Sequence, residues 1–252
     1  MQSIQGTVVI VGATSSIAEH CARLWLQRGA THLVLVGRDA ARTEHLATDL
    51  RVRGPQARID VVTADLLEPA AVRETVSGLL ATGNVPATVL IAHGSLPDQA
   101  ACQQDLDSAA EAMRVNAISP VLFAEAFAGA MQAAGRGRIG IIGSVAGDRG
   151  RKSNYVYGAA KGLVTRYAQG LQHRLAATPV TVTLVKPGPT DTPMTAHLKA
   201  QGAKLADVSA VAAAIVDGIE RGAPVVYAPA KWALIMMVIR HLPRFVFNKM
   251  DI

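Results

Sequence analysis

The chain has 252 residues, of which 50% are hydrophobic, 17% charged and 4% aromatic, and its formal net charge is +6. This composition predicts one large core, and the scarcity of aromatic residues among the basic ones argues against nucleic-acid binding. The amino-terminal residues are too few and polar for a secretory signal, and Cys21 and Cys102 lack neighbours at metal-ligand spacing. We therefore expect a reducing, cytoplasmic location without a metal or a disulfide framework.

The first apolar run, Thr7–Val11, is rich in β-branched residues and precedes a turn of small residues and a helical pattern over residues 17–28. A strand, a tight turn and a helix in this order suit a pyrophosphate, because the backbone approaches closely and the helix N-terminus offers N–H groups. Only Gly12 in the turn is a glycine, whereas Ser16 and Ala18 stand where such turns more often have glycine. The turn alone is therefore a weak signal.

Strands and helices continue to alternate along the chain. We expect further strands over residues 33–36, 58–62, 88–92, 138–142, 180–185 and 225–227. We expect further helices over residues 42–52, 69–80, 106–134, 156–175 and 208–220. Such alternation is typical of a parallel sheet with helices on both faces. The sequence thus predicts an α/β fold, with a single-domain, doubly wound, Rossmann-type sheet of seven parallel strands and ligands beyond their carboxyl ends.

Three polar residues have a spacing that points to chemistry: Ser144, Tyr157 and Lys161. Tyr157 and Lys161 lie about one helical turn apart, so the phenol and the ammonium project from the same face. An ammonium about 4 Å away is worth roughly 4 kcal/mol to a phenolate at an effective dielectric near 20. We therefore expect Lys161 to lower the pKa of Tyr157 until it can act as a general acid, with Ser144 holding a carbonyl beside it. Tyr–Lys pairs one turn apart also occur by chance, so the surrounding motifs decide.

Several motifs in order resemble those of the short-chain dehydrogenase/reductase family over nearly the whole chain. They are the turn from Gly12 to Ala18, Asp65-Leu66, Ala92-His93-Gly94, Asn116 in Arg-Val-Asn-Ala, the trio Ser144, Tyr157 and Lys161, and Pro187-Gly188 followed by Thr192. The resemblance implies a carbonyl reductase with a nicotinamide cofactor, assembled as a homodimer or homotetramer. It also implies roles: Tyr157 as the acid/base, Lys161 as the holder of the cofactor ribose, Ser144 as the carbonyl clamp, and Asn116 as the anchor of a proton-relay water.

The same resemblance implies a set of cofactor contacts. They are Gly12, Thr14, Ser15, Ser16, Ile17, Arg38, Asp65, Leu66, Ala92, His93, Gly94, Tyr157, Lys161, Pro187, Gly188, Thr190 and Thr192. Two positions depart from the family pattern, since Ala92 stands where asparagine is common and His93 where alanine is common. His93 could be an extra base, but a hydrogen-bonded structural imidazole is the favoured interpretation.

The end of the second strand bears on the choice of cofactor. An acidic residue at this strand end would bind a ribose 2′-hydroxyl and repel a 2′-phosphate, but Gly37 occupies the place and Arg38 follows it. The sequence therefore favours NADPH. NADH stays possible, because Arg38 could stack on the adenine or be solvated and Asp39 could still reach the ribose.

Two basic segments stand out from an otherwise scattered charge. Arg149, Arg151 and Lys152 lie between Ser144 and Tyr157, and we expect them at the mouth of the site, unless the segment is a solvated turn. We divide the chain into a catalytic domain, residues 1–229, and a basic amphipathic tail, residues 230–252. The apolar run 232–239 is too short to span a bilayer, which requires about twenty residues. The tail is expected at a membrane interface, in a subunit interface or as a lid over the pocket.

Within the family, the chain resembles most the polyprenylphosphoryl (decaprenylphosphoryl) 2-keto-ribose reductases. The resemblance rests on Arg149 to Tyr157, on Thr195-Ala196-His197-Leu198, and on the tail from Tyr227-Ala228-Pro229 to His241-Leu242-Pro243. It implies the reducing half of a two-step epimerase for cell-wall arabinose, in which a flavin-dependent oxidase partner supplies the 2-keto sugar. A lipid-linked phosphodiester at the inner face of the plasma membrane would explain the basic loop, since Arg149, Arg151 and Lys152 could bind it.

Two other functions stay open from the sequence. One is a reductase of another lipophilic, steroid-like or acyl ketone, because the trio is indifferent to what bears the carbonyl. The other is a non-catalytic, cofactor-sensing protein on the same scaffold. A sensor of this kind would have a broken catalytic set, whereas here Asn116, Ser144, Tyr157 and Lys161 are all present.

Overall fold

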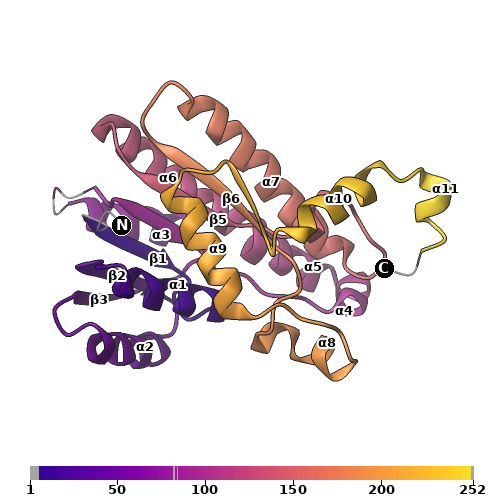
Figure 1. The fold of residues 1–252 in the computed structure, drawn as a ribbon, viewed down its shortest axis with the longest axis horizontal. Coiled ribbons are helices and arrows are strands. Elements are labelled where there is room, and N and C mark those ends of the chain that lie inside the picture. Colours follow the sequence, from indigo (N-terminus) through magenta and orange to yellow (C-terminus); the bar gives the residue numbers. More distant parts are fainter. Residues whose placement is uncertain (1–5, 82, 84, 251–252) are drawn as a thin grey trace.

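Seven parallel strands form the central sheet of the computed structural model, which describes residues 6–81, 83 and 85–250 (Figure 1). The strands are β1 (Thr7–Val11), β2 (His32–Gly37), β3 (Arg58–Thr63), β4 (Thr88–Ile91), β5 (Arg138–Ile142), β6 (Thr181–Pro187) and β7 (Val225–Ala228). Their order across the sheet is β3-β2-β1-β4-β5-β6-β7. The predicted fold class and sheet are confirmed.

Most of the predicted helices are present with small shifts at their ends. The helices are α1 (Ser16–Gln27), α2 (Ala40–Arg53), α3 (Pro69–Leu80), α4 (Gln99–Gln104), α5 (Leu106–Met113), α6 (Ser119–Ala134), α7 (Tyr155–Leu175), α8 (Ala196–Ala200), α9 (Val208–Glu220), α10 (Lys231–His241) and α11 (Arg244–Phe247). Short 3₁₀ turns lie at η2 (Val145–Asp148) and η3 (Pro193–Thr195), and a π-helical turn lies at η1 (Arg114–Ile118).

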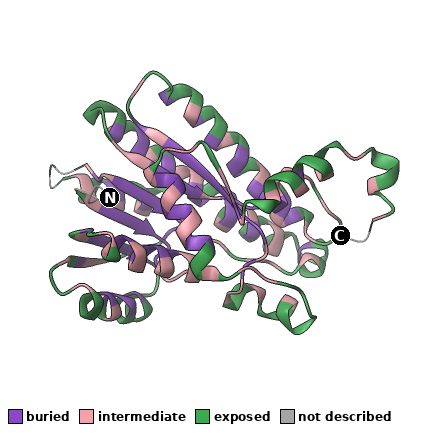
Figure 2. Ribbon diagram, viewed as in Figure 1, coloured by how far each residue is buried: buried purple, intermediate pink, exposed green. Residues whose placement is uncertain are grey.

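Different helices cover the two faces of the sheet, because side chains alternate in direction along each strand. On β1, Val9 and Val11 belong to one hydrophobic cluster, whereas Val8 and Ile10 belong to the other. Helices α3, α6 and α7 complete the first cluster, and α1, α2 and α9 complete the second. Figure 2 shows the result as buried strands between two helical layers. The alternation of apolar side chains along the strands therefore provides an apolar surface for a helical layer on each face of the sheet.

The predicted helix over residues 106–134 contains a π-helical turn that separates α5 from α6. In this turn, η1, the backbone N–H of Ser119 donates to the carbonyl of Arg114, five residues earlier. By length and composition alone, Leu106–Ala134 could cross a membrane. In the structure α6 instead packs into the core, where Phe123, Phe127 and Met131 are fully buried.

The strand order changes direction at β1, which pairs with β2 on one side and β4 on the other. The chain winds outwards through β2 and β3, then returns to place β4 beside β1 and winds outwards again through β5, β6 and β7. Loops that leave the carboxyl ends of β1 and β4 diverge at this point, which opens a crevice for ligands. The functional residues gather there.

The last segment, residues 231–250, leaves the body of the molecule, and we call it the C-terminal arm (Figure 1). It consists of α10, α11 and the residues after them. The inner side of α10 packs against the body through Met236, which is fully buried, and through Trp232, whose indole lies against Gly188. A Cβ on Gly188 would lie only 1.9 Å from the indole nitrogen, so this contact requires glycine.

Candidate active site

A cavity of about 160 Å³ lies at the carboxyl ends of β1, β4, β5 and β6. Its walls contain Ser15, Ile17, Ala92, His93, Gly94, Ser95, Leu96, Asn116, Ile142, Gly143, Ser144, Val145, Ala146, Arg151, Asn154, Tyr157, Lys161, Pro187, Gly188, Pro189, Thr190, Thr192, Met194, Thr195 and Leu198. All four predicted catalytic residues are among them. The lining contains two cations, Arg151 and Lys161, and no carboxylate among the described residues.

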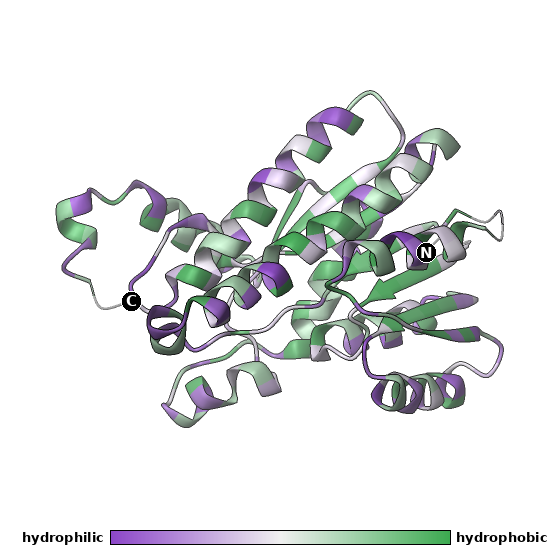
Figure 3. Ribbon diagram, turned by 180° about the vertical axis from the view of Figure 1, so that it is seen from behind, coloured by the Kyte–Doolittle hydropathy of each residue, from purple (hydrophilic) through white to green (hydrophobic). Residues whose placement is uncertain are grey.

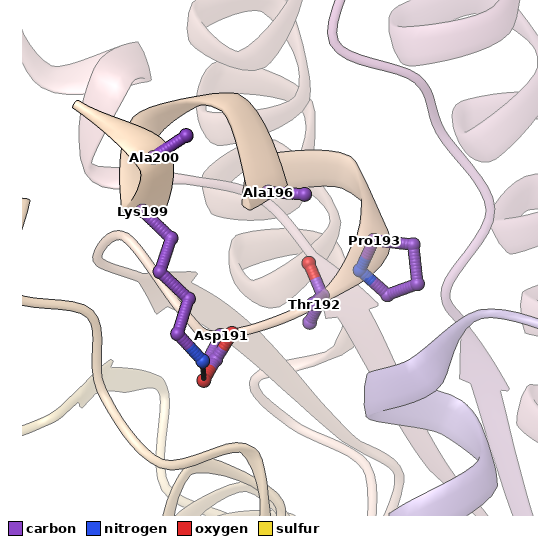
Figure 4. Close-up of a pocket in the computed structure, with 6 residues that line it drawn as sticks. All are labelled: Asp191, Thr192, Pro193, Ala196, Lys199 and Ala200. Atoms are coloured by element: carbon purple, nitrogen blue, oxygen red, sulfur yellow. Dashed lines mark hydrogen bonds and ion pairs between the residues drawn. The ribbon is translucent and has the colours of Figure 1, made fainter.

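A second, shallow depression lies on the outer surface beside this cavity, over η3 and α8 (Figure 4). Asp191 and Lys199 close one side of it with an ion pair of 2.5 Å, and Pro193 and Ala196 line the other. Thr192 belongs to both the depression and the cavity wall. The depression contains none of the four predicted catalytic residues, so the enclosed cavity is the candidate site.

Ser144 and Tyr157 come together in the cavity as the sequence predicts. Ser144 follows β5 and begins the η2 turn, where its hydroxyl accepts a hydrogen bond from the Ala146 N–H at 3.1 Å. Tyr157 lies in the first turn of α7. Burial raises the pKa of the Tyr157 phenol, while a hydrogen bond with Ser144 and the charge of Arg151 act in the opposite direction. The balance keeps the phenol protonated at neutral pH, which is the form that donates a proton.

The expected effect of Lys161 on Tyr157 is wrong in this structure. The Lys161 ammonium donates a hydrogen bond to the Ile142 carbonyl at 3.1 Å and lies 5.8 Å from the centroid of the Tyr157 ring. One helical turn therefore places the ammonium beside the ring, where the end of β5 holds it. The pKa of the phenol is raised on balance by burial, and the cation whose charge opposes this rise is Arg151. Burial lowers the pKa of Lys161 itself to about 8.

Asn116 is fully buried in the π-helical turn, and its side chain ties this turn to the loop after β4. Its amide oxygen accepts from the Ser95 N–H at 2.9 Å, and its amide nitrogen donates to the Ala112 carbonyl at 3.0 Å. A Cβ on Gly94 would lie 2.9 Å from that amide oxygen and 3.5 Å from the Lys161 ammonium. Asn116 thus holds the floor of the cavity beside Lys161. The proton-relay water assigned to it stays a prediction.

His93 is hydrogen-bonded, in agreement with the favoured interpretation from the sequence. Its Nε2 lies 2.7 Å from the Ser119 hydroxyl, which in turn donates to the Leu66 carbonyl, so Nε2 is the protonated nitrogen. Its ring stands edge-on to Phe123 with 5.8 Å between the centroids. Burial, and then the charges of Lys161 and Arg38, lower the pKa of His93 to about 3. The neutral His93 imidazole therefore has a structural role, through its hydrogen bond to Ser119 and its contact with Phe123.

The turn after β1 has the shape that a dinucleotide requires. Gly12 has a positive φ of 77°, and a Cβ there would lie 2.5 Å from the Cβ of His93. Ser15 begins α1, where its side chain accepts from the Ala18 N–H. Ser15 and Ile17 both line the cavity, so the N-terminus of a twelve-residue helix opens into it. These features suit the pyrophosphate of a nicotinamide dinucleotide.

The end of β2 separates two residues that the sequence left as rival ribose contacts. Asp39 is the N-cap of α2, and its side chain accepts from the Arg42 N–H at 3.0 Å. Arg38 is exposed and is near enough to lower the pKa of His93. Gly37 lies against Thr43, since a Cβ there would be 2.3 Å from the threonine hydroxyl. The Asp39 carboxylate therefore caps the helix, whereas the Arg38 side chain is exposed at the end of β2.

Some predicted cofactor residues lie outside the walls of the cavity. Gly12, Thr14 and Ser16 form the turn behind it, and Asp65 is at the edge of the groove beyond β3, where its carboxylate accepts from the Leu67 N–H at 2.8 Å. Leu66 is buried in the core. The side chain of Leu66 is therefore a packing residue.

The loop between η2 and α7 does not act as one basic unit. Arg151 lines the cavity, but Arg149 and Lys152 do not. The Arg149 guanidinium turns to the C-terminal arm, where it donates to the Ile239 carbonyl at 2.5 Å and to the Leu242 carbonyl at 2.8 Å. It also lies 3.7 Å above the centroid of the Phe247 ring. Lys152 is exposed. Of these three residues only Arg151 lines the cavity, and its substrate role stays a prediction.

Arg151 has no hydrogen bond or ion pair from its side chain within the described part of the chain, and its Nε is buried. Asn154, at the start of α7, also lines the cavity and has a buried amide oxygen without a hydrogen-bond donor. Asn154 could not be recognised from the sequence as a site residue, because an asparagine before a helix is ordinarily a cap. A charged donor and a neutral acceptor thus stand unpaired in the cavity wall next to Tyr157.

The start of the loop between η2 and α7 is also fixed by a buried ion pair between Asp148 and Lys186. The Tyr227 hydroxyl donates to the same carboxylate at 2.8 Å. Burial and this carboxylate raise the pKa of Tyr227 to about 12, so it stays a donor. Asp148 is therefore neutralised by its neighbours and adds no free negative charge near Arg151.

Comparison with known proteins agrees with this geometry. The family model for short chain dehydrogenases matches residues 6–203. The chain belongs to the short-chain dehydrogenase family. An uncharacterised oxidoreductase of Mycobacterium tuberculosis is 35% identical over 249 residues, which cover 96% of each chain. The family is one of oxidoreductases, so the chain is an enzyme and not a silent sensor.

Two solved structures of short-chain dehydrogenase type have the same fold. The bulky-bulky ketone specific alcohol dehydrogenase of Comamonas testosteroni is 27% identical, with a TM-score of 0.80 over 99% of this chain and 96% of that one. A short-chain dehydrogenase of Sphingobium yanoikuyae in complex with NADPH is 26% identical, with a TM-score of 0.83 over 98% and 96%.

Proposed function

We propose that this short-chain dehydrogenase is an NADPH-dependent carbonyl reductase that reduces the 2-keto group of a polyprenylphosphoryl keto-pentose to the arabinose epimer. Arg151 carries this proposal. An unpaired, partly buried guanidinium is costly unless a ligand supplies the opposite charge, and a phosphodiester does so with bidentate geometry. The Asn154 amide oxygen beside it can accept from a sugar hydroxyl. A flavin-dependent oxidase would supply the ketone, at the inner face of the plasma membrane.

In the proposed reduction, each residue of the site has a separate role. NADPH, when bound, supplies the hydride. The Ser144 hydroxyl holds the carbonyl oxygen, and the Tyr157 phenol, already protonated, gives its proton to that oxygen as the alcohol forms. Lys161 would hold the nicotinamide ribose, and its short contact with the Ile142 carbonyl fixes the ammonium for that task. The reaction then ends with a phenolate whose charge Arg151 stabilises.

The preference for NADPH rests on the end of β2. Asp39 caps α2, where its side chain accepts from the Arg42 N–H, so this carboxylate is already used in the helix and is not free to bind a ribose 2′-hydroxyl. Arg38 is the exposed cation at this edge of the groove. The Sphingobium yanoikuyae enzyme of the same fold binds NADPH. An Arg38→Ala variant should therefore lose kcat/KM with NADPH and keep it with NADH.

The substrate proposal is tested with two ketones that share one reacting centre. One carries a prenylphosphoryl group and the other is the free keto-sugar. Replacing Arg151 by Gln should raise KM for the phosphorylated ketone by about 30-fold or more, and for the free sugar only a few-fold. Lys152→Gln removes a charge from the same loop outside the cavity and is the matched control. Equal effects of Arg151→Gln on both ketones would remove the phosphate from the assignment.

A second candidate substrate class has its own observation. Leu96, Met194 and Leu198 line the cavity with apolar surface, which suits a bulky lipophilic ketone without a charge. The Comamonas testosteroni enzyme of the same fold is specific for bulky-bulky ketones. The same variant decides, because Arg151→Gln should leave KM for a neutral bulky ketone unchanged, while the lost stabilisation of the phenolate lowers kcat alone.

A further inference from the structure

Helix α10 has two apolar stripes, of which only one is covered. Residues 232, 235, 236 and 239 fall on the side that packs against the body. Leu234, Met237 and Val238 fall on another side, and 65%, 47% and 52% of their surface is exposed. A helix that contacts only one neighbour ordinarily has polar residues on its outer side. The outer stripe of α10 therefore lacks a partner within the described chain.

Two more large apolar side chains are exposed beyond the end of α10. Phe245 in α11 is 70% exposed and Val246 is 37% exposed, and we call these two with Leu234, Met237 and Val238 the outer patch. Figure 3 shows hydrophobic and hydrophilic residues side by side along the arm. Large apolar side chains gathered at one place on a surface mark an interaction site.

The charge around the outer patch has one sign. Lys231, Arg240, Arg244 and Lys249 are all exposed on the arm. Residues 230–250 contain no aspartate or glutamate. Lys231 lies one turn before Leu234, and Arg240 lies one turn after Met237, so cations flank the apolar stripe at both ends. An apolar stripe with flanking cations is the pattern of a helix that lies in the interface of an anionic bilayer.

The arm is held in the orientation that presents this patch. Arg149 donates to two carbonyls at the end of α10 and stacks on Phe247, while Trp232 rests on Gly188. These contacts keep the inner stripe of α10 packed against the body of the molecule. The outer patch cannot turn inwards without breaking these contacts, so no part of the described chain can cover it in this arrangement.

We propose that the C-terminal arm docks the enzyme on an anionic lipid surface through the outer patch. A second copy of the chain fits less well, because a two-fold contact through this patch would bring the cations of one arm against those of the other. Docking would bring the enzyme to the surface that holds a lipid-linked substrate, and in this respect the inference rests on the proposed function. At eleven residues, α10 is suited to lie in the interface, since a spanning helix needs about twenty.

Sedimentation with vesicles tests the docking without any substrate. The full-length enzyme should bind vesicles containing phosphatidylglycerol, bind vesicles of phosphatidylcholine alone much less, and be released by salt. The triple variant Leu234→Ser, Met237→Ser, Val238→Ser should weaken the partition coefficient by about tenfold or more. The residues Leu106 and Val52, both changed to Ser, form the matched control, because they are remote in sequence and even more exposed, at 83% and 78%.

A charge series separates the two parts of the interaction. Lys231→Glu with Arg240→Glu should weaken binding to the anionic vesicles, whereas the single exposed change Arg73→Glu on α3 should not. Unchanged vesicle binding by the triple variant overturns the proposal. It is also overturned if that variant lowers the oligomeric state in sedimentation velocity, since the patch would then be a subunit interface. Turnover of a soluble keto-sugar, measured in parallel, reports on the proposed reaction independently of docking.

Discussion

At the scale of single residues, burial decides the protonation states in the cavity. Tyr157 stays a neutral phenol because its desolvation outweighs the hydrogen bond from Ser144 and the charge of Arg151. A reductase needs this form, since its tyrosine must give a proton away. Burial lowers the pKa of both cations, from a much higher usual value in Arg151 than in Lys161, and brings the pKa of Lys161 to about 8.

The change Tyr157→Phe tests the proton donor. It removes only the hydroxyl, so the shape of the cavity is kept. We expect kcat for carbonyl reduction to fall by about 10²–10⁴-fold, which is the usual worth of a general acid. The dissociation constant of NADPH, followed by fluorescence, should stay within about threefold of wild type. Turnover above a tenth of wild type would assign the proton donor elsewhere.

The pH dependence should report on Lys161. Burial lowers its pKa to about 8, so the ammonium is charged below that pH and neutral above it. We expect kcat/KM for reduction to fall as the pH rises through about 8, because the neutral amine loses its hold on the ribose. The Lys161→Arg variant cannot titrate there. If it retains the same alkaline decline, another group is responsible.

Lys161 should affect stability in the opposite direction. Its pKa in the folded chain lies below the ordinary lysine value of 10.5, so between about pH 8 and pH 10.5 the unfolded chain binds more protons. This group therefore adds stability as the pH rises through that window. His93 acts likewise at acid pH, where stability is lost as the pH falls from about 6.5 towards 3.

At the scale of elements, the strand-turn-helix unit of β1 and α1 depends on Gly12. This residue combines a positive φ with a backbone contact to His93. Gly135, at the end of α6, also has a positive φ, of 63°, but has open space where a Cβ would be. Gly12 and Gly135 therefore both have a positive φ, but only at Gly12 would a Cβ clash with a neighbouring residue.

The pair of changes Gly12→Ala and Gly135→Ala separates these effects. We expect Gly135→Ala to cost about 1–2 kcal/mol in the free energy of unfolding, from the left-handed backbone alone. Gly12→Ala should cost about 1–3 kcal/mol more, because its methyl group meets His93. Urea unfolding of both variants measures the difference. Equal losses would mean that the turn can move away from His93.

The elements that sequence could predict are those set by local apolar patterns. The strands and helices of the sheet follow from periodicities within about ten residues, and their positions are confirmed. The π-helical turn at Arg114–Ile118 was beyond this kind of inference, since it shifts one hydrogen bond and leaves the apolar pattern intact. Arg149 was misplaced for the opposite reason, because its partners Ile239 and Leu242 lie about ninety residues away.

At the scale of the whole molecule, one side chain joins the loop between η2 and α7 to the C-terminal arm. Replacing Arg149 by Ala removes both hydrogen bonds to the end of α10 and the stacking on Phe247. We expect amide hydrogen exchange in residues 231–247 to rise by about tenfold or more, while exchange in β1 and α1 is unchanged. Arg166→Ala, a neighbouring exposed change on α7, is the control. Unaltered exchange in the arm would show that Trp232 and Met236 suffice to hold it.

Gly188 separates the cavity from the C-terminal arm. One side of this residue forms the wall of the cavity and the other carries the indole of Trp232. The partition between the cavity and the arm is thus a single backbone residue thick. A ligand that displaces this partition must also move the arm, and a surface that fixes the arm must restrain the partition. Because such coupling is reciprocal, the occupant of the cavity and the occupant of the outer patch should alter each other's affinity by the same factor.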